Sequence, residues 1–145
     1  MANVIYRGQV HVHQPVTKTA LVSGALLPGV AVNLTGASFT AATTGRGRIY
    51  ILGEREFYGQ TIDTAYVSGE TGIAYEATPD VEFQVRAVAA AYTRGQALSV
   101  TTAGAFKAAV TGDVVVAFVD QADETLAAPG FLDVSIAANS YVVPA

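Results

Sequence analysis

The sequence predicts an all-β fold, either a small β-barrel or a β-sandwich, built from two related hairpin units and carrying an extended N-terminal arm. Three observations support this prediction. Short segments with apolar residues two positions apart recur along the 145 residues and are separated by turns rich in Gly and Pro. Convincing helical periodicity is lacking. The third observation is an internal repeat, which is typical of a fold assembled from one structural unit used twice.

The repeat consists of residues 29–52 and residues 95–119. Each copy has a short alternating segment, a turn with Gly and one Phe, then Ala-Ala, Thr-Gly and a second apolar segment. With one residue inserted, Phe39 of the first copy matches Phe106 of the second. We therefore predict two equivalent β-hairpins, with both phenylalanines buried at the same place in each.

The segments outside the repeat predict further strands, in chain order, at residues 18–22, 72–76, 81–86 and 131–136. Two interpretations of Thr61 to Val67 stay open. This segment is either one or two helical turns with Thr61 as the N-cap, or an extended crossover. Residues 141–144 are interpreted as a short apolar tail.

Residues 1–16 are predicted to be an extended arm, and residues 17–145 a single β domain with one core. The arm alternates like a strand, Gly8 interrupts it, and Pro15 separates it from the hairpin that follows. Its backbone donors then lack an intrachain partner, so we expect a neighbouring chain to complete the strand. The residues expected to contact another subunit or a capsid are Val4, Tyr6, Val10, His11, Val12 and His13.

Composition limits the classes of partner. Apolar residues make up 51% of the chain and charged residues only 14%, against ~25% in typical soluble domains. This excess of apolar residues favours a surface partly covered by other subunits. The net charge of −4, without a basic cluster, argues against nucleic acid. No apolar tract approaches the ~20 residues of a membrane-spanning helix, so no membrane partner is expected.

The sequence predicts no enzyme, no metal and no cofactor. His11 and His13 would share one face of a strand, as two ligands of one metal do, but no further ligand is near and an exposed pair is favoured. The loop with Asp120, Asp123 and Glu124 lacks the spacing and central Gly of a calcium loop. The charged cluster at residues 54–56 is interpreted as a solvated loop.

Several short segments occur in a recognisable order across residues 17–136: Ser23 to Gly29, Gly45 to Leu52, Gly59 to Tyr66 with Gly69-Glu70, and Gly95 to Leu98 near Thr101 to Lys107. In this order they resemble the head decoration, or cement, proteins of tailed bacteriophages. The resemblance implies a β-rich module, usually trimeric, that sits on the outside of an assembled capsid and often has an extended terminal arm. It implies no catalytic motif, and residues 11–13 are not part of the pattern.

We therefore expect a virion structural protein that binds the major capsid protein on the outer capsid surface, after synthesis in the host cytoplasm. It would act as an oligomer, a homotrimer by the resemblance. One alternative is a tail or tube component, which would form rings by itself. Another is a carbohydrate-binding module, which needs a platform of exposed aromatic residues. The seven Tyr and six Phe lie mostly at inward positions and Trp is absent, which disfavours that alternative.

Overall fold

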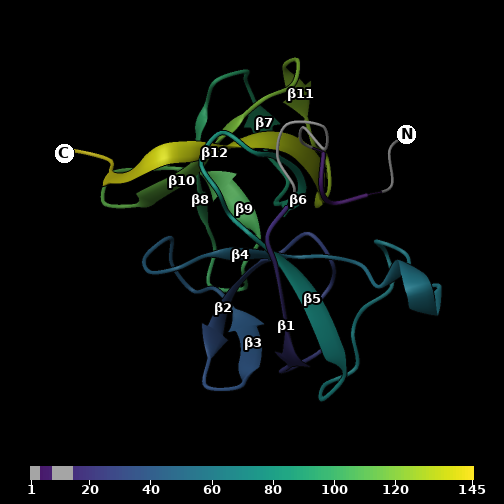
Figure 1. Cartoon of the computed structure of the whole chain (residues 1–145). Coiled ribbons are helices and arrows are strands. Elements are labelled where there is room, and N and C mark those ends of the chain that lie inside the picture. Colours follow the sequence, from purple (N-terminus) through teal and green to yellow (C-terminus); the bar gives the residue numbers. More distant parts are fainter. Residues whose placement is uncertain (1–3, 8–14) are drawn as a thin grey trace.

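The computed structural model describes residues 4–7 and 15–145 and is nearly all β, as predicted. The described residues form two closed five-stranded barrels (Figure 1). The first barrel contains β1 (Thr17–Val22), β2 (Ala31–Thr35), β3 (Ser38–Ala41), β4 (Tyr50–Leu52) and β5 (Thr71–Glu76). The second contains β6 (Glu82–Ala87), β8 (Ala97–Val100), β9 (Phe106–Ala108), β10 (Val114–Val119) and β12 (Gly130–Val142). The remaining elements are a small sheet of β7 (Ala91–Tyr92) with β11 (Glu124–Thr125), and the 3-10 helix η1 (Glu56–Tyr58).

The two barrels have the same strand topology. In each, the first strand pairs in parallel with the third, as β1 does with β3 and β6 with β9. The first strand also pairs antiparallel with the last, and the second strand pairs antiparallel with the third and the fourth. The fourth and last strands close each barrel. The duplication therefore covers a whole barrel, whereas the sequence had indicated only a repeated hairpin.

The register of the two hairpins confirms that they are equivalent. Leu34 pairs with Phe39 in the first barrel, and Val100 pairs with Phe106 in the second. Both phenylalanines are fully buried, as predicted. The matching apolar positions of the two copies therefore correspond to matching positions in the two barrels.

One interpretation of the sequence needs correction, and the structure decides between the two that stayed open for residues 61–67. The first two residues of the apolar tail at 141–144 belong to β12, because Tyr141 pairs with Val115 and Val142 with Val114. Residues 61–67 contain no helix but one hydrogen-bonded turn within an extended crossover. Contacts with distant parts of the chain hold this segment in place of a helix, because Ile62 and Tyr66 are buried and the Tyr66 N–H donates to the Leu26 carbonyl at 2.8 Å.

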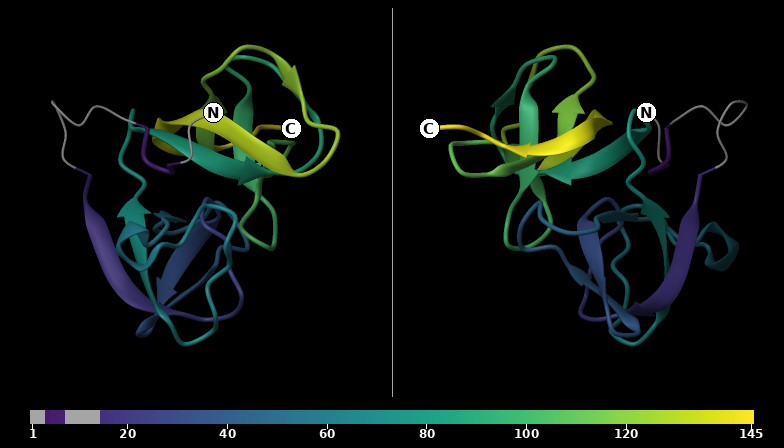
Figure 2. Two further views of the ribbon diagram at one scale, coloured as in Figure 1. Left: turned by 90° about the vertical axis from the view of Figure 1, so that its right-hand side faces the viewer. Right: turned by 60° about the vertical axis from the view of Figure 1, so that its left-hand side comes forward.

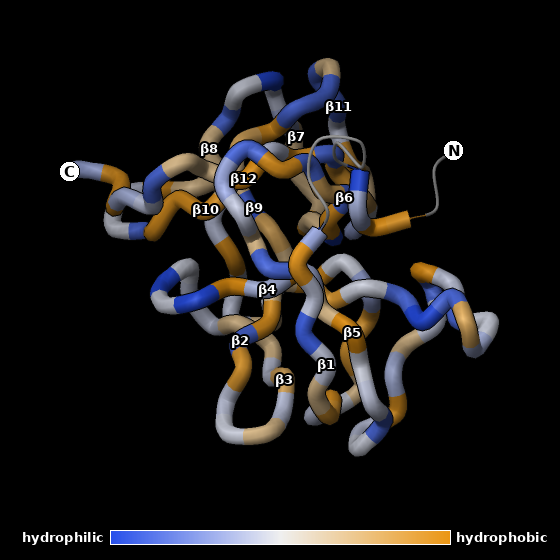
Figure 3. Tube along the Cα trace, in the orientation of Figure 1, coloured by the Kyte–Doolittle hydropathy of each residue, from blue (hydrophilic) through white to orange (hydrophobic). Residues whose placement is uncertain are grey.

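The apolar core consists of two clusters in place of the single core expected. One cluster fills the first barrel. The larger cluster fills the second barrel and includes Ala31, Ile49 and Ile51, which come from the first. Since alternate side chains of a strand point to opposite faces, Ala31 and Ile51 point away from their own barrel and are buried against its neighbour. The barrels therefore share a packed junction, and Figures 2 and 3 show them lying one above the other.

Backbone contacts also join the barrels. Gly104 has a φ of +79°, and its carbonyl accepts a hydrogen bond from the Ala31 N–H at 2.8 Å. A Cβ at Gly104 would lie 2.4 Å from the Ala31 oxygen, so only Gly permits this approach. From β6, the Arg86 backbone N–H donates to Gly29 at 2.9 Å and its Nε donates to Pro28 at 2.9 Å.

Residues 4–7 pair with the beginning of β6 in the same chain. Tyr6 forms an antiparallel bridge with Phe83, the Gln84 N–H donates to the Ile5 carbonyl at 2.8 Å, and Ile5 is fully buried. The expectation that residues 1–16 lack an intrachain partner is therefore wrong for residues 4–7. The sequence could not indicate this pairing, because the partner strand lies far along the chain and the segment has no hairpin of its own.

Candidate interaction surfaces

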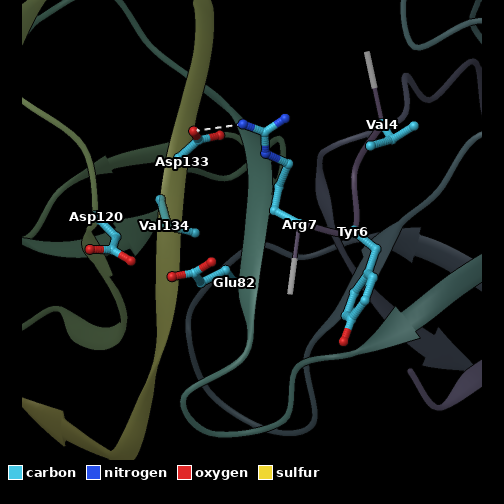
Figure 4. A pocket seen from close by; sticks show the side chains of 7 residues that line it. All are labelled: Val4, Tyr6, Arg7, Glu82, Asp120, Asp133 and Val134. Atoms are coloured by element: carbon cyan, nitrogen blue, oxygen red, sulfur yellow. Dashed lines mark hydrogen bonds and ion pairs between the residues drawn. The ribbon is translucent and has the colours of Figure 1, made fainter. Parts of the chain in front are cut away.

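The first candidate surface is a pocket of about 360 Å³ beside residues 4–7, named here the N-terminal pocket. Its side chains come from the N-terminal segment, from β6, from β12 and from the residue that follows β10 (Figure 4). They are Val4, Tyr6, Arg7, Glu82, Asp120, Asp133 and Val134.

Three carboxyl groups and one cation line this pocket. Arg7 forms an ion pair with Asp133 at 3.2 Å. A hydrogen bond to the Asp120 carboxyl, followed by burial, raises the pKa of the Glu82 carboxyl. Carboxyl groups this close resist ionising together, so they share a proton or attract a positive charge. In the described part of the chain, Arg7 supplies that charge and thereby ties the N-terminal segment to the second barrel.

The structure places two of the six predicted contact residues, Val4 and Tyr6, in the N-terminal pocket. The Tyr6 ring stacks on Tyr75 with 5.7 Å between ring centroids and meets Phe83 edge to face at 5.7 Å. Both residues are only partly exposed, so an intrachain junction takes much of their surface. Their contact with another chain stays a prediction. The other four residues, Val10, His11, Val12 and His13, lie outside the described part of the chain.

The second candidate surface is the connection between β4 and β5, residues 53–70, named here the projecting loop. Figure 1 shows it extending away from both barrels, with η1 near its end. Phe57 is 97% exposed and Tyr58 79% exposed. Arg55 forms an ion pair with Glu70 at 3.0 Å, and its guanidinium lies 5.0 Å from the Tyr58 ring centroid. The loop therefore holds two adjacent aromatic side chains in solvent.

Glu54 corrects the interpretation of residues 54–56 as a solvated loop. This residue is only 7% exposed, and its Oε2 has no hydrogen-bond partner among the described residues. Burial is the main cause of a raised pKa of Glu54, and hydrogen bonds from the backbone of Glu54 itself and of Ile5 partly offset it. Burial, followed by the charge of Glu54, also raises the pKa of Tyr75 to about 12. Of the three charged residues, Glu56 alone is exposed to solvent.

The third candidate surface is a pocket of about 260 Å³ at the junction of the barrels, named here the junction pocket. Its apolar side chains include Ile49, Val116 and Ile136. The turn between β3 and β4 forms one rim, where Arg48 pairs with Glu76 and keeps 63% of its side chain exposed. The same turn carries Arg46, which is exposed.

The acidic loop after β10 serves a structural purpose in this fold. Asp123 Oδ1 accepts a hydrogen bond from the Arg94 N–H at 2.9 Å, and Glu124 lies on β11. Within the described ranges, no group of three or more His, Asp or Glu side chains is arranged to hold a metal ion. In the same ranges, no helix is long and apolar enough to span a bilayer.

Comparisons with known proteins give no family assignment. No protein-family model matches the sequence, and a search of curated proteins finds no match.

The projecting loop was not predicted from the sequence as an interaction surface. The available signal was the run Glu56-Phe57-Tyr58-Gly59, in which aromatic residues adjoin a charge and a turn-forming Gly.

Proposed function

We propose that this protein is a virion structural protein that decorates the outer surface of an assembled bacteriophage capsid, binds its major capsid protein and acts as a homo-oligomer, a trimer by the resemblance. The order of short segments across residues 17–136 supports the proposal. The structural observation that carries it is the distribution of exposed apolar side chains over both barrels and the projecting loop. They are Val16, Leu21, Leu34, Phe57, Tyr58, Val67, Val110, Tyr141 and Val142.

Such a distribution suits a protein with more than one protein neighbour. A decoration protein contacts copies of itself and also the capsid, so it needs apolar contacts on more than one side. Large apolar side chains that stay exposed on an isolated chain gain free energy when a partner covers them. The low charge content reduces the cost of removing water from these surfaces.

The test is co-sedimentation of the purified protein with empty, expanded heads of the same phage. We expect binding that saturates at a fixed ratio to the capsid protein, and heads that resist heating better when the protein is bound. Unexpanded heads provide the matched control for nonspecific adsorption. Absence of binding, together with rings or tubes formed by the protein alone, would instead support a tail or tube component.

The exposed pair Phe57 and Tyr58 favours one second candidate, a carbohydrate-binding module. Aromatic rings in solvent can stack on sugar rings. Most aromatic residues were predicted to point inward, but these two are exposed. Retention of the protein on insoluble polysaccharides, abolished by Phe57→Ala and Tyr58→Ala, would support this function. Equal retention of the double variant and the intact protein would exclude it.

A further inference from the structure

We propose that pH controls the docking of the N-terminal segment, residues 4–7, through the buried carboxyl group of Glu54. The segment stays docked on the second barrel while this carboxyl carries a proton, and it detaches more readily once the carboxyl ionises. The inference goes beyond the proposed function and depends on neither capsid binding nor self-association.

Docking of the segment is a local equilibrium. The Gln84 N–H donates to the Ile5 carbonyl at 2.8 Å, and the Arg7 N–H donates to the Glu82 carbonyl at 3.1 Å. The Ile5 side chain is fully buried between these two bonds. Terminal segments of this length open at a free energy below that of global unfolding, so a change of charge beneath the segment can shift its docking.

Glu54 lies against the docked segment. The residue is buried, the Ile5 backbone donates a hydrogen bond to its carboxyl, and Oε2 has no hydrogen-bond partner among the described residues. The charge of Glu54 also acts on Tyr75, the ring on which Tyr6 stacks. The segment is therefore part of the cover over this carboxyl, and its detachment would admit water to Glu54.

The direction of the pH effect follows from this burial. A buried carboxylate with an unpartnered oxygen costs free energy that the protonated group does not cost. Burial raises the pKa of Glu54 while the segment is docked, and the pKa returns towards the usual range of a Glu when the segment detaches. Docking is therefore tightest below the usual pKa of a Glu, weakens as pH rises to the raised pKa, and levels off above it.

Other ionisable groups surround the buried side chains of this region. They are Arg55, Glu56, Tyr66, Glu70 and Tyr75. Arg55 is paired with Glu70, and the Glu56 carboxylate adds to the raised pKa of Glu54. Burial raises the pKa of Tyr66 and of Tyr75, so both rings stay neutral at the pH where Glu54 ionises.

The carboxyl groups around Arg7 act in the opposite sense. Glu82, Asp120 and Asp133 line the N-terminal pocket, and Figure 4 shows Arg7 directed towards Asp133. Ionised carboxyl groups attract Arg7 and favour docking, so their titration cannot produce a weakening of docking as pH rises. Loss of docking with rising pH therefore distinguishes Glu54 from this cluster.

Detachment would uncover the beginning of β6. On one side, residues 82–84 pair with β12, and on the other side they are covered by the N-terminal segment. Without the segment, the Phe83 ring and the backbone groups of this edge would face solvent. Such an edge can pair with a strand of another chain, so Glu54 would control access to a strand-pairing surface.

Hydrogen exchange of single backbone amides, followed by NMR, measures docking directly. The Gln84 N–H is protected by its bond to Ile5, whereas the Arg86 N–H of the same strand donates to Gly29 and reports opening of β6. From pH 5 to pH 8, the protection factor of Gln84 should fall about 5-fold or more relative to that of Arg86.

Two matched variants identify the group responsible. Glu54→Gln should abolish the fall in protection, because an amide does not ionise. Glu56→Gln changes an exposed neighbour in the same loop and should leave the fall in place. Histidines ionise in the same pH range, so every protein in the experiment carries His11→Gln and His13→Gln.

Linkage also requires the reverse effect. Ile5→Gly removes the buried side chain of the segment and weakens docking, so the pKa of Glu54 should move down towards the usual range of a Glu. NMR titration of the Glu54 carboxyl measures this pKa. Leu34→Ala, at an exposed position of the first barrel, is the control and should leave it unchanged.

Three results would overturn the proposal: protection of Gln84 that does not change with pH relative to Arg86, an equal fall in Glu54→Gln, or an unchanged pKa of Glu54 in Ile5→Gly. None of these measurements uses capsid heads. Their failure therefore leaves decoration intact, and a protein that does not bind heads contradicts decoration alone.

Discussion

The two barrels have one topology but differ in the connection between their fourth and last strands. In the first barrel, residues 53–70 form the projecting loop with its exposed η1. In the second barrel, the equivalent residues 120–129 fold back, and β11 pairs with β7. Since the strands on either side pair in the same way, this connection can change without affecting closure of the barrel. The comparison shows where a duplicated fold can acquire a new surface.

The barrels also differ in how they are packed. The interior cluster of the first barrel is the smaller, and side chains on its outer face, including Ala31 and Ile51, are buried against the second barrel. The second barrel receives these side chains and is covered by residues 4–7 as well. The first barrel therefore depends on the junction for much of its burial. Four predictions follow, ordered by the expected change in the free energy of unfolding.

The largest effect should come from the equivalent phenylalanines. Phe39→Ala and Phe106→Ala each remove a fully buried ring and should each cost about 3–5 kcal/mol in the free energy of unfolding. Because the barrels share a junction, both variants should unfold in one transition in urea, monitored by circular dichroism. Phe57→Ala, at an exposed site, is the control and should change stability by less than about 0.5 kcal/mol. Losses below ~1 kcal/mol at both buried sites would contradict the assignment of the repeat.

The second prediction concerns the backbone contact between the barrels. Gly104→Ala should cost about 2–4 kcal/mol, since it combines a positive φ with a clash against Ala31. Gly47→Ala is the matched control, because Gly47 has a φ of +78° but nothing within 4 Å of the added Cβ. It should cost only about 1 kcal/mol. Equal losses, measured by thermal unfolding, would show that the junction does not constrain this position.

The third prediction is a pH-dependent effect at Glu54. Burial raises the pKa of this carboxyl in the folded protein, so the unfolded chain releases the proton at a lower pH than the folded one. The free energy of unfolding should therefore fall as pH rises from the usual pKa of a Glu to the raised pKa. Glu54→Gln removes this loss because an amide does not ionise, and it should be more stable than the intact protein at pH 8 by about 1–2 kcal/mol, since it buries a neutral group in place of a charged one.

The difference between Glu54→Gln and the intact protein should shrink towards pH 4, where the carboxyl is protonated in both states. Urea unfolding at pH 4, 6 and 8 measures it. Glu56→Gln is the control, because that neighbouring side chain is exposed. If Glu54→Gln were equally stable or less stable at pH 8, the carboxylate would have to be stabilised in the folded state.

The smallest effect should come from the ion pair of Arg7 with Asp133. Both side chains are partly exposed, at 29% and 35%, so their coupling energy should be about 0–1 kcal/mol and should decrease with added salt. A double-mutant cycle of Arg7→Ala and Asp133→Asn measures it. A coupling above ~2 kcal/mol would mean that this pair, and not burial of Ile5, holds the N-terminal segment on the second barrel.

The sequence by itself determined the local features of this protein. Alternation of apolar residues identified the β class, the strand at residues 81–86, and the equivalent hairpins with buried Phe39 and Phe106. These features depend on which face of a strand a side chain occupies, and neighbouring residues decide that. The turn-forming glycines marked where strands end for the same local reason.

Tertiary structure alone decided the rest. Closure of two barrels, burial of Ile5 and Glu54 and exposure of Phe57 depend on segments that are distant in the sequence and meet only in the folded chain. Glu54 and Phe57 belong to one run of charged and aromatic residues, yet the carboxylate is buried and the aromatic ring is exposed. Local periodicity assigns a side chain to one face of an element, but only the packing of other elements decides whether that face is covered.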